Sequence, residues 1–369
     1  MVVHYDNRIK RRIEEFRPEG PIGFGQLKTN NMLVMKYKDG EWKNPWIVPT
    51  SDGFNLDPFA TVLHYGQEIF EGAKAFKHDD GELYTFRIDE NAKRFNESAD
   101  IMCMPNIPVK NQIQLIETLL DLERNHYPIK KDSCFYIRPF MFGTSAALGV
   151  KPSLEYTFAV VLSPSGPYFS EGFNPSRLLI TNEFKRAAPN GTGNAKAGGN
   201  YAASLRAGLR AKELGAKQVL YTDCNNELIE EAGAMNHYHV TKDGTIVIPK
   251  FTNSILQSIT SKSNIELSDR LGIRVVQEDV PMKYFIDSIC NGEIVEAGGL
   301  GTAAVISPVN EYVLDNGRIL TVGDGNIGPV SRKMHDLLTG IQTGRYEAPE
   351  GWLRKVERRY WFFYFLLIA

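Results

Sequence analysis

The chain has 369 residues, of which 43% are hydrophobic and 23% are charged, a composition typical of a globular protein with one large domain or two domains. The 42 Lys and Arg residues nearly balance the 44 Asp and Glu residues, so the formal net charge is −2, and no nucleic-acid partner is indicated. The four cysteines are far apart and form no CxxC pair, which argues against a disulfide framework or a zinc site.

The two ends of the sequence carry no pattern typical of export or membrane insertion. The start, MVVHYDNRIKRRIEEF, lacks the apolar core of a secretory signal, and its acidic residues fit a transit peptide poorly. We therefore expect a cytoplasmic protein. The final ten residues, YWFFYFLLIA, are apolar, but a membrane span takes roughly 20 residues, so none is predicted.

The first half of the chain predicts short strands and several helices. Helices are expected at 89–102, with Asp89 as N-cap, and at 111–127, and LHYGQEIFEGAKAF (63–76) also has its apolar residues at helical spacing. Strand or hairpin patterns occur in MLVMKYKDGEW (32–42), HDDGELYTFR (78–87), FYIRPFMFG (135–143) and YTFAVVLSP (156–164).

The second half predicts strands in runs, interrupted by a few helices. Helices are expected at 200–214, ended by Gly215, and at 258–271, ended by Gly272. Strands are expected in RLLITNEF (177–184), KQVLYTD (217–223), EEAGAMNHYHVT (230–241), IVIP (246–249) and EIVEAGGLGTAAVISPV (293–309). This order favours an α+β or barrel-like domain over a regular βαβ repeat.

A segment rich in Pro, Gly and Ser, SPSGPYFSEGFNPS (163–176), separates the two halves. We therefore predict a small N-terminal α/β domain at 1–165, a linker at 166–176 and a larger domain at 177–353. The apolar residues near the end leave an atypical tail at 354–369.

Several motif matches fail on their context. GLGTAA (299–304) fits a dinucleotide-binding pattern, but β-branched residues follow it where a helix is required. GTGNAKAG (191–198) lacks the Gly before and the hydroxyl after the lysine of a phosphate-binding loop. His237 and His239 would share one face of a strand, yet no third metal ligand is near in sequence, so a structural role is favoured.

Lys196 stands in the loop GNAKAGGNYAASL (193–205), among residues too small to form a core. Glycines let the backbone approach a ligand closely, and a desolvated lysine can form a Schiff base with a carbonyl compound. An exposed lysine in a surface loop explains the composition equally well.

Three further features could serve a ligand, and each also has a structural explanation. Glu230 and Glu231 could place one carboxylate inward, but a solvated turn is the simpler interpretation. The segments 254–260 and 299–302 could offer backbone N–H groups to a phosphate, or be a helix cap and a hairpin turn. Arg138, beside Tyr136 on a strand, needs a carboxylate partner, which could belong to a substrate or to the protein.

Taken together in this order, these residues resemble one family: the branched-chain amino acid aminotransferases, among the fold-type IV pyridoxal-phosphate enzymes. The resemblance runs from about residue 20 to 353. Its densest matches are LHYGQEIFEGAKAF, FYIRPFMFG, KAGGNYAASL (196–205), EAGAMN (231–236) and GTAAVISPV (301–309). It implies a two-domain fold, transamination of branched-chain L-amino acids (Leu, Ile, Val) with 2-oxoglutarate by a ping-pong route, and a homodimer.

The resemblance also implies a role for each matching residue. Lys196 would hold pyridoxal 5'-phosphate as a Schiff base and move the substrate proton, Tyr201 would bind the phenolic oxygen of the cofactor, and Glu231 its pyridine nitrogen. The cofactor phosphate would be bound by Arg94, Ile259, Thr260 and Thr302. The substrate would be bound by Tyr65, Phe70, Tyr136, Arg138, Thr302 and Ala303, with Tyr65 supplied by the neighbouring subunit.

The chain departs from the family pattern around the phosphate site. A Pro-Gly pair usually precedes the Ile-Thr and an arginine follows it, whereas Gln257 and Ser258 precede it here and Ser261 follows. Ala304 and Ser307 stand where some members carry a redox CxxC, so no thiol switch is expected. The alternatives are a D-amino acid transaminase or aminodeoxychorismate lyase of the same fold type, or a binding protein that has kept the fold without activity.

Overall fold

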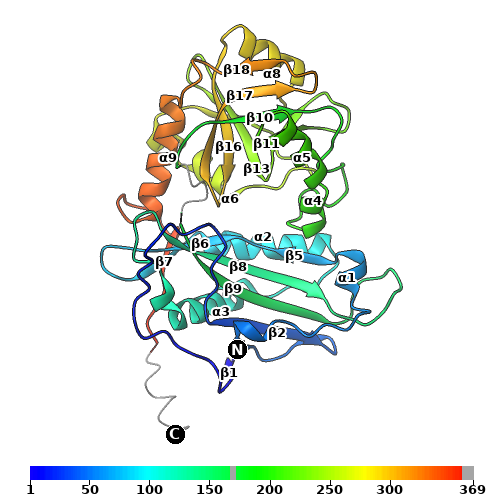
Figure 1. Ribbon diagram of the computed structural model, residues 1–369, viewed down its shortest axis with the longest axis vertical. Coiled ribbons are helices and arrows are strands. Elements are labelled where there is room, and N and C mark those ends of the chain that lie inside the picture. Colours follow the sequence, from blue (N-terminus) through cyan, green and yellow to red (C-terminus); the bar gives the residue numbers. More distant parts are fainter. Residues whose placement is uncertain (167–171, 360–369) are drawn as a thin grey trace.

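Two β-sheets, each with its own helices, form the two domains of the chain (Figure 1). The computed structural model describes residues 1–166 and 172–359. Part of the predicted linker and the final YWFFYFLLIA therefore lie outside the described residues.

The small domain, drawn in blue to green in Figure 1 apart from the red β19, is built on a sheet with the order β1-β4-β2-β9-β8-β6-β7-β19, with β3 pairing β2 and β5 pairing β8. The strands are β1 His4–Tyr5, β2 Asn31–Lys38, β3 Glu41–Trp42, β4 Trp46–Pro49, β5 Glu68–Phe70, β6 Ala73–Lys77, β7 Leu83–Phe86, β8 Cys134–Gly143, β9 Tyr156–Ser165 and β19 Leu353–Lys355. The helices are α1 Thr61–Tyr65, α2 Ile88–Ile101 and α3 Val109–Leu122, with short 3-10 turns at Thr50–Asp52 and Arg124–His126.

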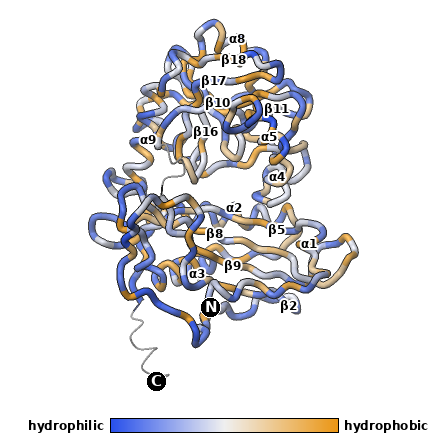
Figure 2. Tube along the Cα trace, viewed as in Figure 1, coloured by the Kyte–Doolittle hydropathy of each residue, from blue (hydrophilic) through white to orange (hydrophobic). Residues whose placement is uncertain are grey.

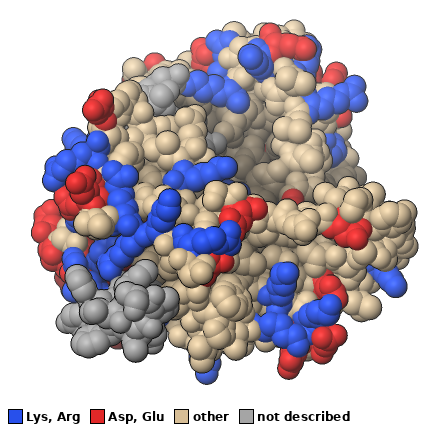
Figure 3. All heavy atoms as spheres, turned by 60° about the horizontal axis from the view of Figure 1, so that its bottom comes forward, with Lys and Arg blue, Asp and Glu red and all other residues tan. Residues whose placement is uncertain are grey.

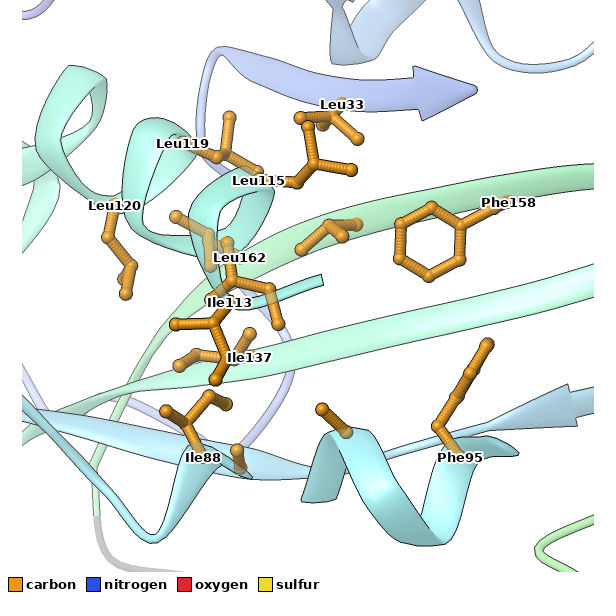
Figure 4. Packing of buried hydrophobic residues seen from close by; sticks show 14 of the residues in the cluster. Leu33, Ile88, Phe95, Ile113, Leu115, Leu119, Leu120, Ile137, Phe158 and Leu162 are labelled. Carbon is orange, nitrogen blue, oxygen red and sulfur yellow. The ribbon is translucent and has the colours of Figure 1, made fainter. Parts of the chain in front are cut away.

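The small-domain core is formed by one side of α2, one side of α3 and the central strands. Figure 4 shows side chains from both helices meeting those of β2, β8 and β9, among them Phe95, Leu115, Leu33, Ile137 and Phe158. All five are fully buried, and truncating such a side chain to Ala costs about 3–5 kcal/mol.

The side chains on the two faces of β8 have different functions. Phe135 and Ile137 belong to the buried core, whereas Tyr136 and Arg138 line a cavity between the domains. Successive side chains of a strand point to opposite faces, so β8 stabilises the small domain with one face and builds a cavity wall with the other.

The large domain contains a closed barrel of six strands. Its sheet has the order β12-β11-β10-β17-β16-β13-β14-β15, and β12 also pairs with β13, which closes the ring. The strands are β10 Ser176–Ile180, β11 Gln218–Thr222, β12 Ile229–Ala232, β13 Met235–Thr241, β14 Ile246–Pro249, β15 Val275–Glu278, β16 Ile294–Gly301, β17 Val305–Leu314 and β18 Ile319–Thr321. The helices are α4 Gly198–Ala202, α5 Leu205–Glu213, α6 Ile259–Glu266, α7 Ser268–Leu271, α8 Met282–Cys290 and α9 Pro329–Gln342.

The predicted α+β fold with a barrel-like second domain is thus confirmed, but some local predictions were wrong. The helical spacing of 63–76 gives a helix only as far as Tyr65, because Gly66 takes a left-handed conformation and ends it, after which the chain forms β5 and β6. Asp89 is not the N-cap of α2: it lies inside the first turn, and the helix begins at Ile88.

Two other helices are shorter than predicted. The segment 200–214 divides into α4 and α5, and 258–271 divides into α6 and α7 at Leu267. After α9 the chain returns to the small domain, where β19 pairs with β7. Three residues are too few for a strand pattern to stand out, so this return was not apparent from the sequence.

His237 and His239 lie side by side within the large-domain core. Their rings are 5.8 Å apart, and both contact Phe285. Neither Nδ1 atom has a hydrogen-bond partner among the described residues. Burial lowers the pKa of His239 from 6.5 to about 4, and burial together with His239 lowers that of His237 in the same direction. This supports the structural role favoured from the sequence.

These histidines predict a loss of stability in mild acid. The unfolded state binds more protons than the folded state between pH 6.5 and about 4, so stability is complete above pH 6.5 and falls as the pH drops through this window. For His239 alone the loss at pH 5 is about 2 kcal/mol. His239→Leu should reduce the difference between urea unfolding free energies at pH 7.5 and 5. An unchanged difference in His239→Leu would contradict this account.

Candidate active site

A cavity of about 660 Å³ lies where the two domains meet, and it gathers most of the residues singled out in the sequence. Figure 3 shows a face of the molecule that is hollowed between the domains. The cavity is lined by Phe70, Arg94, Tyr136, Arg138, Lys196, Tyr201, Glu231, Thr302 and Ala303. Three predicted site residues do not line it: Tyr65, Ile259 and Thr260.

The backbone of Lys196 is hydrogen-bonded to the small domain, although its loop belongs to the large domain. Its N–H donates to Ser98 Oγ of α2 at 2.9 Å, and its carbonyl accepts from Phe70 N–H of β5 at 3.0 Å. On the large-domain side, the amide of Asn200 donates to the carbonyls of Thr192 and Ala195 and closes the loop. The lysine is therefore fixed at the domain boundary.

Gly193 and Gly198, near Lys196, face close neighbours, and for Gly193 that neighbour is backbone. A Cβ on Gly198 would lie 1.7 Å from Glu68 Oε1, and a Cβ on Gly193 would lie 2.5 Å from the carbonyl oxygen of Ser254. Real Cβ contacts are not this short, so the glycines let the loop dock between β5 and the segment before α6. This excludes the flexible surface loop that the composition alone allowed.

The amine of Lys196 faces the phenol of Tyr201. Its Nζ donates to Tyr201 Oη at 2.9 Å and lies 4.9 Å from the ring centre of Phe70. The rings of Phe70 and Tyr201 are themselves 4.9 Å apart. One amine, one phenol and an aromatic wall thus converge on the cavity.

Arg138 is a cation without a carboxylate partner among the residues that the structure describes. Its Nη2 donates to Tyr136 Oη at 3.0 Å, its guanidinium lies 4.6 Å from the ring centre of Phe70, and its buried Nε has no partner there. The structural salt bridge allowed by the sequence is therefore not found. Gly72 makes room for this arrangement, because a Cβ there would lie 2.2 Å from Tyr136 Oη.

Glu231 projects into the cavity from β12 and is held by three groups, one of them the Asn236 amide, which donates to Oε1 at 3.5 Å. Its Oε1 accepts from Leu256 N–H at 2.6 Å, and its Oε2 lies 3.2 Å from Arg186 Nε. Burial raises the pKa of Glu231 to about 7, although Arg186 and the Leu256 N–H oppose this rise. Glu230 is buried too and accepts from Ser254 Oγ, so the solvated turn considered from the sequence is wrong.

Arg94 projects from α2 to the cavity and forms a buried ion pair with Glu71. The guanidinium donates from Nε to Oε1 at 2.6 Å and from Nη2 to Oε2 at 2.9 Å, and from Nη1 to the carbonyl of Gln257 at 2.8 Å. Burial would raise the pKa of Glu71, but the charge and hydrogen bonds of Arg94 outweigh it and lower that pKa. The hydrogen bond from Arg94 to the Gln257 carbonyl connects the small domain to the segment that precedes α6.

The side chain of Ser258 caps the N-terminus of α6. Ser258 Oγ accepts from the N–H groups of Thr260 at 3.1 Å and Ser261 at 3.4 Å, and Ser258 lines the cavity while Ile259 and Thr260 do not. This chain thus departs from the family pattern at the start of α6. There the Ser258 hydroxyl accepts from the helix N–H groups that would bind a phosphate.

Glu71 and Arg186 were missed by the sequence reasoning, although each had a signal. Glu71 is a charged residue in small or apolar surroundings, FEGA, and Arg186 follows Lys185 before two alanines in KRAA, and a buried charge needs a partner. The pairing could not be inferred, because Glu71 is 23 residues from Arg94 and Arg186 is 45 residues from Glu231.

Neither a metal centre nor a membrane helix occurs in the described part of the chain. No group of three or more His, Cys, Asp and Glu side chains there could hold a metal ion. No helix there is long and apolar enough to cross a membrane.

Comparisons with known proteins decide the family. The profile described as Amino-transferase class IV matches residues 68–312. The Bacillus subtilis (strain 168) branched-chain-amino-acid transaminase 1 is 41% identical over 338 residues, which are 91% of this chain and 94% of that protein. The chain belongs to the class IV aminotransferases.

Solved structures agree with this assignment. The Escherichia coli branched-chain amino acid aminotransferase superposes with a TM-score of 0.74 at 28% identity, over 89% of this chain and all of that one. A branched-chain amino acid aminotransferase from T.th., solved with pyridoxamine 5'-phosphate, gives a TM-score of 0.72 at 28% identity, over 90% of this chain and all of that one.

The Arg94–Glu71 pair of this aminotransferase gives a test of coupling. Removing one partner of a buried pair leaves an uncompensated charge and costs about 3–5 kcal/mol, whereas removing both can be nearly neutral. Glu71→Gln and Arg94→Met should each lower the free energy of unfolding, and the double variant should lose less than the sum of the two. Urea unfolding of the four proteins measures this. Additive losses would show that the pair is not the unit we describe.

Proposed function

We propose that this aminotransferase transfers the amino group of leucine, isoleucine and valine to 2-oxoglutarate, with pyridoxal 5'-phosphate as its resident cofactor. The observation that carries the proposal is the convergence of Lys196, Tyr201 and Glu231 on one cavity between the domains. The names of the relatives support the choice of substrates.

The residues present fit the cofactor group by group. The amine of Lys196 suits the carbonyl carbon, the phenol of Tyr201 the phenolic oxygen, and the carboxylate of Glu231 a protonated ring nitrogen. Arg94 and the hydroxyl of Thr302 suit the phosphate. When bound, the cofactor supplies an electron sink for the charge left on the substrate when the α-proton departs.

Lys196 is the proposed catalytic residue. Its Nζ would hold the cofactor and, once freed by the substrate amine, would take the proton from the substrate α-carbon and deliver it to the cofactor instead of returning it to that carbon. Tyr201 Oη, at 2.9 Å, keeps the amine oriented. Because the cofactor would keep the amino group after the first 2-keto acid leaves and before 2-oxoglutarate enters, the kinetics are expected to be ping-pong.

Specificity follows from an aromatic wall beside a cation. Phe70, Tyr136 and Phe24 line the cavity, and the rings of Phe24 and Tyr136 are 4.6 Å apart. An apolar wall distinguishes side chains that differ by one methylene by only about 1–3 kcal/mol, so the three substrates should overlap. The guanidinium of Arg138 is available to the side-chain carboxylate of 2-oxoglutarate.

A substrate panel tests the proposed reaction. With 2-oxoglutarate as acceptor, L-leucine, L-isoleucine and L-valine should react with kcat/KM values within about 200-fold of one another, given the modest discrimination of an apolar wall. Glutamate formation measures the rate. Activity with D-alanine and none with L-leucine would favour the D-amino acid transaminase instead. Cofactor binding without turnover of any amino acid would indicate the silent binding protein.

We further propose a homodimer in which Tyr65 of each subunit serves the cavity of its partner. Tyr65 is 41% exposed at the end of α1 and lies outside the cavity of its own chain. Leu63 on α1, and Leu148, Val150 and Leu154 on the loop between β8 and β9, are at least half exposed, and Tyr65 Oη donates to the Leu148 carbonyl. The tip of this loop is orange beside α1 in Figure 2. Exposed apolar groups in such number favour an interface.

Light scattering after size exclusion tests the dimer. The wild type should have twice the chain mass of 41.5 kDa, and Leu148→Asp with Val150→Asp should give the monomer with at least tenfold lower transamination. Ile319→Asp, an equally exposed apolar position in the large domain, should change neither. A fully active wild-type monomer would refute the shared site.

The cytoplasmic location expected from the sequence stays a prediction, which cell fractionation would test.

A further inference from the structure

Ser258 is a cavity residue to which the proposed function gives no task. It precedes α6, is only 9% exposed and lines the cavity between the domains. Its Oγ accepts from the N–H groups of Thr260 and Ser261, whereas its own hydroxyl hydrogen has no acceptor among the residues that the structure describes. Buried hydroxyl donors are normally paired, and the open side of this residue is the cavity.

The hydroxyl covers the start of the helix. Free N–H groups at a helix N-terminus bind anions, but Ser258 Oγ already engages those of Thr260 and Ser261. Neither of these two residues lines the cavity, and Ser258 does. The donor presented to a ligand here is therefore the O–H of Ser258. The two hydrogen bonds that its oxygen accepts polarise this O–H and make it a better donor.

The backbone that leads into Ser258 is held on both sides. The carbonyl of Gln257 accepts from Arg94 Nη1 at 2.8 Å, and the N–H of Ser258 donates to Asn236 Oδ1 at 2.9 Å. The Asn236 amide in turn donates to the carbonyl of Leu256 at 2.8 Å. These bonds, with the two that the hydroxyl accepts, hold the side chain in place before a ligand arrives.

The donors beside this hydroxyl suit an anion. Arg94 lines the same cavity and contacts the residue that precedes Ser258. A guanidinium has five N–H groups; in Arg94, Glu71 accepts from two of them and the Gln257 carbonyl from one. The other N–H groups of Arg94, together with the hydroxyl, match the oxygens of a phosphate, which accept several charge-assisted hydrogen bonds.

We propose that Ser258 binds the phosphate of pyridoxal 5'-phosphate through its side-chain O–H. The inference rests on the proposed function. It gives the phosphate a ligand outside the set expected from the sequence, and it makes a side-chain hydroxyl the donor at the helix start in place of the backbone N–H groups that this hydroxyl covers.

Two compounds that differ only in the phosphate test this role. Pyridoxal 5'-phosphate and pyridoxal carry the same aldehyde and ring. The full-length protein, freed of cofactor with hydroxylamine in phosphate-free buffer, is titrated with each, and the absorbance of the lysine adduct is followed. In Ser258→Ala the affinity for pyridoxal 5'-phosphate should fall at least about tenfold, because hydrogen bonds to a charged group are the strong ones, while the affinity for pyridoxal changes less than about twofold.

The matched control is Ser263→Ala, on the same helix. Ser263 Oγ donates to the carbonyl of Ile259 at 2.8 Å and accepts from Arg87, but Ser263 does not line the cavity. This variant should lose stability, while both affinities stay within about twofold of the wild type because no bond to the ligand is removed.

Two further variants keep the test informative if Ser258→Ala does not fold. Ser258→Thr retains the hydroxyl and should retain most of the preference for the phosphorylated compound. Glycine is a tolerated N-cap residue, so Ser258→Gly should fold. It should lose that preference, because the N–H groups that it uncovers lie deeper than the hydroxyl.

The outcomes separate the two proposals. An unchanged or higher ratio of the two affinities in Ser258→Ala or Ser258→Gly would show that the N–H groups of α6 bind the phosphate directly. An equal loss for both compounds would show a structural role. Either result would overturn the role of Ser258 while leaving the transaminase intact. Failure of the wild type to bind pyridoxal 5'-phosphate would overturn the proposed function and this inference together.

Discussion

The active site depends on hydrogen bonds that join the backbone of Lys196, in the large domain, to the small domain. Its N–H and carbonyl are both bound by the small domain, through Ser98 and Phe70, while its side chain meets Tyr201 of the large domain. Backbone groups buried at a boundary must be hydrogen-bonded, and these two bonds fix the lysine between the domains. Arg94, bound to Glu71 and to the Gln257 carbonyl, ties the same boundary a second time.

Two of the three arginines singled out in the cavity face a carboxylate, and the third does not. Arg94 is neutralised by Glu71, and Arg186 faces Glu231. Arg138 has no such carboxylate in the described part of the chain. Burying an unpaired cation is costly, which explains why Arg138 lies partly exposed against aromatic rings, where an anionic substrate can reach it.

The sequence predicted the fold class and the residues that meet in the cavity better than it predicted the contacts that hold them. Lys196 and Glu231 were singled out from their local surroundings, and the resemblance to the family added Tyr201 and the role of each. Glu71 and Arg186 were missed because their partners lie 23 and 45 residues away, and periodicity carries no information about such pairs. The helix at 63–76 was wrong because Gly66 and pairing with β8 override the local spacing. The roles of Ile259 and Thr260 stay predictions.

The central claim is that Lys196 is the residue that binds the cofactor. Reduction of the purified, cofactor-loaded enzyme with borohydride makes the bond between lysine and cofactor permanent, and peptide mass spectrometry then locates it. A single phosphopyridoxyl group on Lys196, within residues 193–205, is the predicted result. The same group on any other lysine, or no lysine modified in a protein that still transaminates, would contradict the account.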